Sequence, residues 1–211
     1  MLIRTIALLL LAFSFNVNAQ IRLLPVDQAA SVPDFFSFRA QLQGAIARHD
    51  VASILAALNK DVKLSFGGSS GAEEFKEMWK PSAPDSTLWE VLATTLALGG
   101  TFGPDGSFTA PYVFTRWPQD KDAFSYMAAI GTGIRVRSAP DVNSGVVGSL
   151  DFSVVERAEA TPIDSKWVKV KLHSDRIGFV DARFLRSPID YRITFSKLEG
   201  RWQIVFFVAG D

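Results

Sequence analysis

Apolar residues in the N-terminal half recur at spacings of three and four, which is typical of amphipathic helices. Phe38, Leu42 and Ile46 follow Pro33-Asp34 at this spacing, so the first helix is expected to start at this pair, with Asp34 as its N-cap, and to run to His49. Asp50 is the expected N-cap of a second helix through residue 58. Further helices are predicted over 72–79 and from just after residue 85 to the glycine pair at 99–100, with a short strand at 62–66 between the second and third helices.

The pattern changes near residue 108, where aromatic and β-branched residues predict strands. The segment 108–114 is expected to be a strand interrupted by Pro111, and 118–124 is the most linker-like stretch of the chain. Short apolar runs separated by turn residues then follow up to residue 188, and several short strands at such close spacing indicate a small barrel. These runs lie at 134–136, 146–147, 154–155, 168–172 and 179–180.

The C-terminal segment predicts a hairpin that turns at Glu199-Gly200. Its second half, 202–208, is apolar at nearly every position, so this strand should be covered on both faces. A small barrel with its own strands offers no such cover, and we therefore expect the hairpin to join the strands near 62–66 and 108–114. The predicted fold class is α+β: a helical domain (20–125) whose sheet is completed by the hairpin (188–211), with a small all-β barrel (131–187) inserted between them.

The first 19 residues have the pattern of a cleaved secretory signal. Arg4 is followed by an apolar run over 6–15 and by small residues at Val17 and Ala19, the two positions that a signal peptidase reads. The run is shorter than the roughly 20 residues of a membrane span, and retention as an N-terminal anchor is the alternative. We expect a periplasmic or secreted protein without a stable membrane anchor after cleavage.

Charge and composition narrow the classes of partner. The chain carries 22 acidic and 22 basic side chains and has no polybasic block, so nucleic acid is not an expected partner. It has no cysteine, which excludes a lipid-modified cysteine, a thiolate metal site and a cysteine nucleophile. The hydrophobic content of 48%, with 17 Phe and 5 Trp, is sufficient for a core without disulfides.

Four segments of the predicted barrel resemble the bacterial SH3 domain in order and spacing. They are a Val-Arg-Ser-x-Pro strand and turn, a Val-x-Gly-x-Leu strand, a Trp-x-x-Val strand and a Gly-aromatic-Val strand. The matching positions are Arg137, Pro140, Gly148, Leu150, Trp167, Val170, Gly178 and Val180. The chain departs from the family pattern at Ala139, at Asp151-Phe152 and at Phe179, where the family often has Trp.

The resemblance implies a module that docks on cell-wall peptides or extracytoplasmic proteins and implies no enzymatic activity. Alternation along 167–172 places Trp167, Lys169 and Lys171 on one face, opposite Val168 and Val170. These three residues and Phe179 are the candidate ligand-binding residues, for a polar, partly anionic peptide or glycan. The alternative for Trp167 is that it closes the end of the barrel core.

The two flanking parts resemble, over a shorter stretch, the nuclear transport factor-like cone fold. The helix-Asp50-helix-strand opening and the Gly-Arg-Trp-x-Ile closing strand carry this resemblance. It implies a second possibility, a small-ligand pocket between sheet and helices lined by Trp79, Trp89 and Trp202, with the barrel as a scaffold.

Catalytic and metal-binding patterns are weak. His49 at a helix end and His173 in a turn are explained structurally, and no paired metal-ligand spacing is present. The stretch GGSSGAEEF is explained by a capping box of Ser70 and Glu73 rather than by a phosphate loop. We therefore expect a non-catalytic protein without cofactor or metal, which recognises peptidoglycan peptide or an envelope protein.

Overall fold

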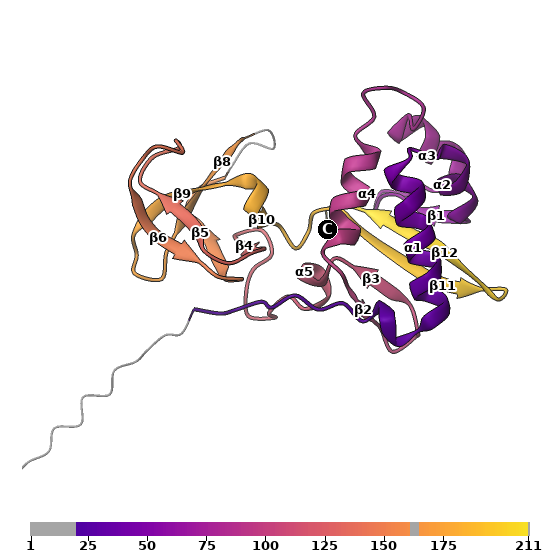
Figure 1. Ribbon diagram of the computed structural model, residues 1–211, viewed down its shortest axis with the longest axis horizontal. Helices are drawn as coiled ribbons and strands as arrows, with labels where there is room; N and C mark the ends of the chain where they lie inside the picture. The colour runs from indigo at the N-terminus through magenta and orange to yellow at the C-terminus, as the bar shows by residue number, and fades with distance from the viewer. Residues whose placement is uncertain (1–19, 161–164, 211) are drawn as a thin grey trace, which may run out of the picture.

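The computed structural model describes residues 20–160 and 165–210, which form an α+β protein with two sheets in two lobes (Figure 1). The predicted signal segment, 1–19, lies outside these residues. The helices are α1 Pro33–Ala47, α2 Val51–Ala57, α3 Ala72–Trp79, α4 Leu88–Ala97 and α5 Tyr112–Thr115. The strands are β1 Leu58–Lys63, β2 Thr101–Phe102, β3 Phe108–Ala110, β4 Tyr126–Ala129, β5 Ile134–Arg137, β6 Val146–Leu150, β7 Val154–Arg157, β8 Trp167–Lys171, β9 Ile177–Asp181, β10 Leu185–Arg186, β11 Arg192–Leu198 and β12 Arg201–Val208.

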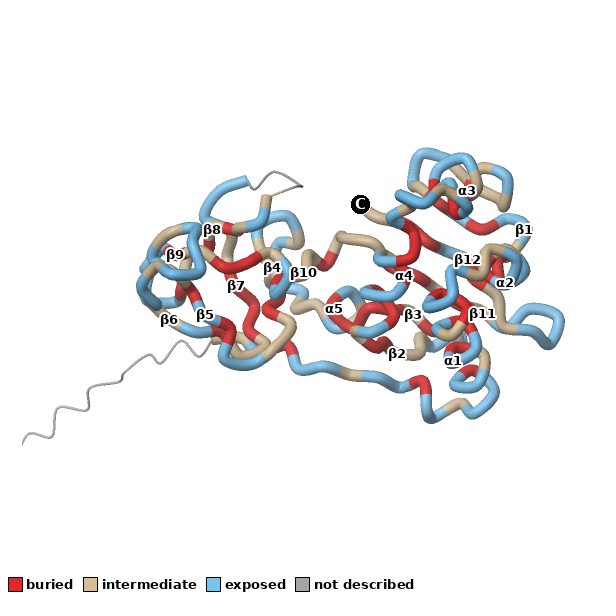
Figure 2. Tube along the Cα trace, turned by 45° about the horizontal axis from the view of Figure 1, so that its top comes forward, coloured by how far each residue is buried: buried red, intermediate tan, exposed pale blue. Residues whose placement is uncertain are grey.

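The first lobe contains a five-stranded sheet in the order β1-β12-β11-β3-β2. The terminal hairpin, β11 and β12, occupies its middle: β12 pairs in parallel with β1, and β11 pairs antiparallel with β3. This is the partner that the apolar hairpin requires. Helices α1 to α4 contribute to a single core with this sheet, and the buried residues of that core run through the inside of the lobe (Figure 2).

The expectation that β12 is covered on both faces holds only in part: the adjacent residues Phe207 and Val208 are 1% and 2% exposed, whereas Phe206 is exposed. A register shift opposite Thr194 and Phe195 breaks the alternation of β12, so that Ile204 and Phe207 are both buried in the core. Phe206 between them is 41% exposed, whereas Phe207 is 1% exposed. The irregularity of pairing therefore accounts for the burial of both Ile204 and Phe207.

Two aromatic groups fill the core of the first lobe. Phe35 of α1 lies within 5.5 Å of the rings of Phe108, Phe195 and Trp202. Phe207 stacks on Trp79 with 5.0 Å between ring centroids. Such pairs add to the energy of burial alone, and each fixes a helix of this lobe against the hairpin.

Several local predictions are corrected by the structure. The N-cap of α1 is Val32, and Asp34 instead holds Lys197 and Trp202 of the hairpin at 2.6 and 3.2 Å. The first strand lies at 58–63 rather than 62–66, and residues 112–115 form α5 rather than a strand. The cap of α3 is Gly71, and the carboxylate of Glu74, not that of Glu73, accepts from the backbone N–H of Ser70.

The second lobe contains a seven-stranded sheet in the order β10-β4-β7-β8-β9-β5-β6. Its inner face buries an aliphatic cluster that includes Val136, Leu150, Val168, Val170 and Val180. The sheet includes β4 and β10, which sequence patterns did not predict, so its first strand begins before residue 131. The expected strands β5 to β9 are all present.

Two glycines of this sheet allow close packing of neighbouring strands. A Cβ on Gly178 would lie 2.5 Å from Cγ1 of Val136 and 2.9 Å from the carbonyl oxygen of Arg137. A Cβ on Gly148 would lie 2.7 Å from Cδ1 of Leu172. At both glycines the neighbouring atoms therefore lie closer to the backbone than a residue with a Cβ would permit.

The two lobes share a third buried cluster. It is formed by Leu23 of the N-terminal segment, Tyr112 and Val113 of α5, Ala128 of β4 and Val154 of β7. The N-terminal segment extends along both lobes (Figure 1). It bonds the second lobe through the N–H of Leu23 to the carbonyl of Phe152 (2.6 Å), and the first lobe through the N–H of Gln28 to the carbonyl of Gly100 (2.9 Å).

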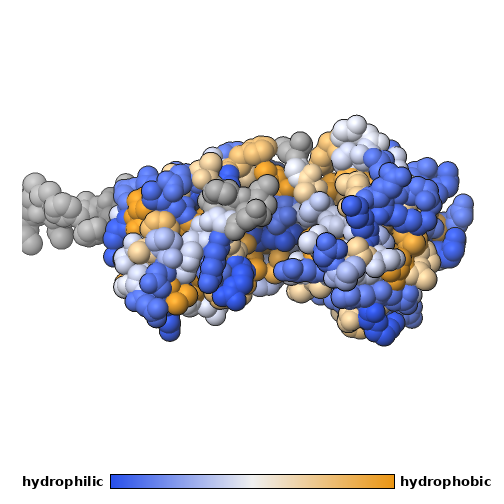
Figure 3. All heavy atoms as spheres, turned by 90° about the horizontal axis from the view of Figure 1, so that it is seen from above, coloured by the Kyte–Doolittle hydropathy of each residue, from blue (hydrophilic) through white to orange (hydrophobic). Residues whose placement is uncertain are grey.

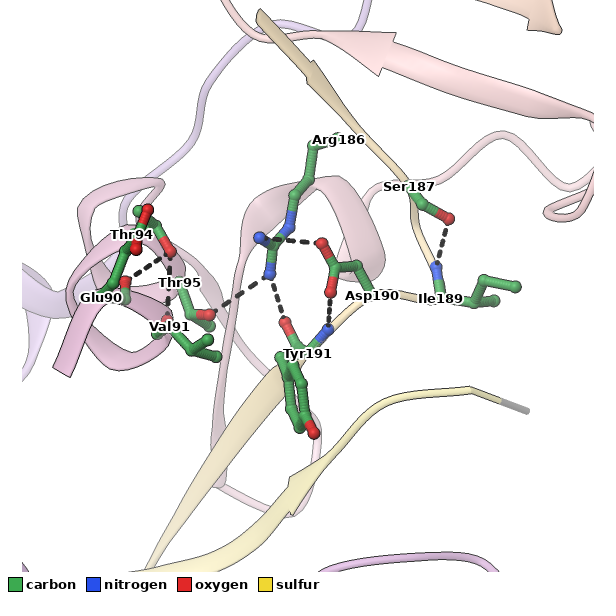
Figure 4. A network of polar contacts seen from close by, with 9 residues as sticks. All are labelled: Glu90, Val91, Thr94, Thr95, Arg186, Ser187, Ile189, Asp190 and Tyr191. Atoms are coloured by element: carbon green, nitrogen blue, oxygen red, sulfur yellow. Dashed lines mark hydrogen bonds and ion pairs between the residues drawn. The ribbon is translucent and has the colours of Figure 1, made fainter. Parts of the chain in front are cut away.

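A buried arginine adds a polar connection at the same junction (Figure 4). Arg186 leaves β10 and donates to the carbonyl of Tyr191 at 2.7 Å and to the hydroxyl of Thr95 at 3.3 Å. It also forms an ion pair with Asp190 at 3.0 Å. Burial lowers the pKa of Arg186 from its usual value, and the charge of Asp190 opposes this shift. The arginine thus links the exit of the second sheet to α4 and to the start of the hairpin.

The surface has mixed polarity. On the face seen from above, hydrophilic residues surround smaller hydrophobic patches over both lobes (Figure 3). No helix of residues 20–160 and 165–210 is long and apolar enough to cross a membrane.

The register shift in β12 predicts unequal effects of substituting two adjacent phenylalanines. Phe207→Ala should lower the free energy of unfolding by about 3–5 kcal/mol, because it leaves a cavity against Trp79. Phe206→Ala should lower it by only about 1 kcal/mol, because 41% of the residue is already exposed. Denaturant unfolding of both variants measures these two changes. Equal losses in the free energy of unfolding would contradict the burial of Phe207 and the exposure of Phe206 in β12.

The junction makes a second prediction. Arg186→Met should destabilise the protein by about 1–3 kcal/mol, because the carbonyl of Tyr191 and the carboxylate of Asp190 lose their partner. The control is Lys76→Met, which removes the ion pair with Glu73 on the surface of α3 and should cost far less. Thermal unfolding of both variants measures the difference, and equal shifts in Tm would show that the buried arginine carries no special weight.

Candidate functional site

The four candidate residues lie together on the outer face of β8 and β9. Trp167, Lys169 and Lys171 alternate with Val168 and Val170, which are 3% and 0% exposed on the inner face. Phe179 of β9 lies directly opposite Lys169 in the antiparallel pair, so the cross-strand side chains are neighbours. We call these four residues the β8–β9 face.

Trp167 belongs to this outer face. It is half-buried, pairs across the strands with Asp181, and is not part of the inner apolar cluster of the described residues. Ser165 orders the start of the strand, because its hydroxyl donates to the carbonyl of Trp167 at 2.7 Å. The alternative in which Trp167 closes the core is therefore not supported by the packing.

Both lysines of the β8–β9 face are engaged by exposed carboxylates. Lys169 forms an ion pair with Glu159 and Lys171 with Asp175, each at 3.0 Å. The hydrogen bond from Lys171 to Asp175 raises the pKa of the Lys171 ammonium, and the charges of Asp175 and Glu156 add to this. Sequence patterns did not identify these carboxylates, because Glu159 follows β7 and its pairing with β8 is not visible from spacing.

A hollow with a volume of ≈ 650 Å³ lies at Lys171 on the second lobe. Its lining includes Tyr126 of β4, Glu156 of β7 and His173 of the turn that follows β8. The hollow also reaches the N-terminal segment at Gln20 and Ile21. The β8–β9 face thus continues into a concave, polar region that sequence reasoning missed, since β4 was not predicted.

Two charged residues near the β8–β9 face have local hydrogen-bond partners. Arg137 donates to the carbonyl of Ser144 at 2.8 Å, which supports the turn between β5 and β6. The carboxylate of Asp181 accepts from Arg183, and this interaction lowers the pKa of Asp181. Neither residue is placed as a ligand contact.

The three tryptophans proposed for a cone pocket belong to separate groups. Trp79 packs on Phe207 and Tyr191, Trp89 stacks on the ring of His49 at 4.7 Å, and Trp202 packs on Phe35. Trp79 and Trp89 are 8% and 6% exposed. They fill the interior rather than line a common cavity.

The two histidines lie apart from each other, one in each lobe. His49 follows α1 with a positive φ of 54°, and His173 lies exposed in the turn between β8 and β9. Within residues 20–160 and 165–210, no group of three or more His, Asp or Glu side chains is placed to hold a metal ion. The chemistry offered by the β8–β9 face is therefore contact with an aromatic ring, an apolar ring and two ammonium groups.

The raised pKa of Lys171 predicts a pH-dependent effect. A group whose pKa is raised by folding adds stability below its unfolded pKa and loses this contribution as the pH rises through the folded pKa, so the effect falls in the alkaline range. Asp175→Asn should shift the titration of Lys171 to lower pH. NMR titration of the Lys171 Cε signal in the wild-type and Asp175→Asn proteins measures this, and an unchanged Lys171 titration would contradict the assigned cause.

Comparison with known proteins adds little to this geometry. No protein-family model matches the chain, and no curated protein matches it. A solved structure of a protein of unknown function with a cystatin-like fold, from Nostoc punctiforme PCC 73102, is similar over 87% of this chain and 92% of its own, with 11% identity. Its TM-score is 0.27, and a likeness of this size carries no argument about fold or function.

Proposed function

We propose that this protein is an exported, non-catalytic binding protein of the cell envelope, periplasmic or secreted. In this proposal the second lobe is a bacterial SH3-like barrel, and its β8–β9 face recognises peptidoglycan peptide. The observation that carries the proposal is that Trp167, Lys169, Lys171 and Phe179 lie on one outward face rather than in the core. Export rests on the sequence pattern of residues 1–19, which lie outside the described part of the chain.

The chemistry of the face suits a peptide that bears carboxylates. Glu159 and Asp175 have side chains that are 57% and 83% exposed, and ion pairs of this kind contribute little to stability. A ligand carboxylate can therefore replace either of them on Lys169 or Lys171 at a small cost. Trp167 and Phe179 supply ring surface for the apolar part of the same ligand.

An envelope protein with an acidic segment is the second occupant that this face fits, for the same reasons. The cone-type alternative is weaker, because the packing of Trp79 and Trp89 counts against the pocket on which it depends.

Co-sedimentation of the purified mature protein with isolated cell walls tests the proposal. We expect wild-type protein to pellet with the walls, and Trp167→Ala to weaken this binding by about tenfold, the loss typical of a central aromatic contact. Lys169→Glu combined with Lys171→Glu should weaken it at least as much, by repelling the carboxylates of the peptide.

The matched control exchanges two exposed lysines of the first lobe, Lys63→Glu with Lys80→Glu, and should pellet as wild type does. Wild-type protein that stays in the supernatant would remove the cell-wall version. Equal losses in both double variants would show that net charge, and not the β8–β9 face, drives sedimentation.

A further inference from the structure

The first lobe contains a larger hollow that the β8–β9 face does not involve. It has a volume of ≈ 1010 Å³ and lies between α1 and α2 on one side and β1 and the hairpin on the other. Ligand pockets in proteins typically have about this size, and they combine an apolar lining with a few polar groups. We call it the α1–β12 hollow.

An irregularity in β1 explains why the hollow exists. Leu58 pairs with Ile204 and Lys63 with Phe206, so four residues of β1 stand against one of β12. Of the four extra residues, Val62 is buried in the core, whereas Asn59, Lys60 and Asp61 line the hollow. The N–H of Asp61 donates to the side chain of Asn59 at 2.9 Å. Bulges of this kind re-aim side chains and are frequent beside binding sites.

The floor of the hollow is apolar and continuous with the core. Leu42 and Ala45 of α1, Ala57 of α2 and Leu58 of β1 are each at most 8% exposed, and the half-buried ring of Trp202 completes the floor. Polar side chains form the rim. Gln203 accepts from Asn59 at 2.8 Å, which holds two of these side chains in place across the β1–β12 pair.

The rim carries exposed charged side chains, and two of its arginines have no hydrogen-bond or ion-pair partner within the described part of the chain. Of the five charged lining residues, Lys60 and Asp61 form an ion pair with each other at 3.0 Å. Arg48, Arg201 and Glu199 remain, and no hydrogen bond or ion pair within 4 Å is found for the two guanidinium groups in the described chain. Hydrogen bonds from Ser53 lower the pKa of the Asp50 carboxyl, and the charge of Arg48 adds to this only from further away. The nearest acid to Arg48 in sequence, Asp50, is held by the N–H and hydroxyl of Ser53 at 3.0 and 2.6 Å.

We propose that the α1–β12 hollow binds a small amphipathic carboxylate. Its apolar body lies on the floor formed by Leu42, Ala57 and Trp202, and its carboxylate meets Arg48 and Arg201 at the rim. The planar guanidinium group matches a carboxylate with two parallel hydrogen bonds. Three cations against two carboxylates leave one net positive charge at the rim, which suits a ligand with a single negative charge.

Isothermal titration calorimetry of the mature protein with sodium decanoate, below its micelle concentration, tests this inference. We expect saturable binding of decanoate, with decanol and decyltrimethylammonium at least about tenfold weaker, because an arginine–carboxylate hydrogen bond is worth more than a neutral contact. Arg201→Gln and Arg48→Gln should each weaken decanoate binding about tenfold and leave the binding of decanol unchanged. Wild-type protein that binds no decanoate, or decanol that binds as tightly, would overturn the proposal.

The location is tested with a matched pair on α2. Ala56 is exposed and lines the hollow, so Ala56→Trp should fill it and abolish binding. Ala52 is exposed on the same helix and does not line the hollow, so Ala52→Trp should bind decanoate as wild type does. Undiminished binding to the Ala56 variant would place the site elsewhere.

Arg201→Gln keeps the test decisive if the tryptophan variants do not fold, because Arg201 is exposed at the start of β12. The hollow variants should still pellet with cell walls as wild type does, so the failure of this inference and the failure of the proposed function are distinguishable.

Discussion

The pairing of the terminal hairpin with the middle of the first sheet is the constraint on which the rest of this structure depends. The strands β11 and β12 separate β1 from β3, and the core beneath them includes residues from four helices. Without the hairpin, β1 and β3 would not belong to one sheet, and the rings of Phe35 and Trp79 would lose the hairpin residues on which they pack. The second lobe is consequently an insertion in the first lobe: the chain enters it from the first lobe and returns to the first lobe when it leaves.

The junction determines how the two lobes present their surfaces. Leu23 and Tyr112 belong to a buried cluster shared by both lobes, and Gly99 and Gly100 let the N-terminal segment and β3 approach the end of α4 closely. A Cβ on Gly99, whose φ is +63°, would lie 2.7 Å from the carbonyl of Val26. Apolar contact, backbone hydrogen bonds and the Arg186 network therefore all act at the junction of the two lobes. Together they oppose independent motion of one lobe against the other.

Local patterns predicted much of this fold, and features that depend on distant partners were missed. The helical spacing of apolar residues predicted α3 and α4, and the glycine pair at 99–100 predicted the end of α4. The alternation of polar and apolar residues predicted that Trp167, Lys169 and Lys171 share one face of β8. The strand β4 was not predicted, because Ala128 and Ala129 have no strand preference and are fixed by their neighbours. The shift in alternation along β12 and the α1–β12 hollow both lie at irregularities of strand pairing. Such irregularities cannot be read from the sequence of one strand alone.

The order of the strands also has a consequence for biosynthesis. The sheet of the first lobe uses the earliest strand of the chain and the last one as direct neighbours. On the ribosome, helices α1 to α4 emerge long before the residues that close their core, whereas the second sheet is complete by residue 186. The nascent N-terminal half must therefore wait, incompletely packed, until nearly the whole polypeptide has been made, and a chain that ends early would leave it without a finished interior.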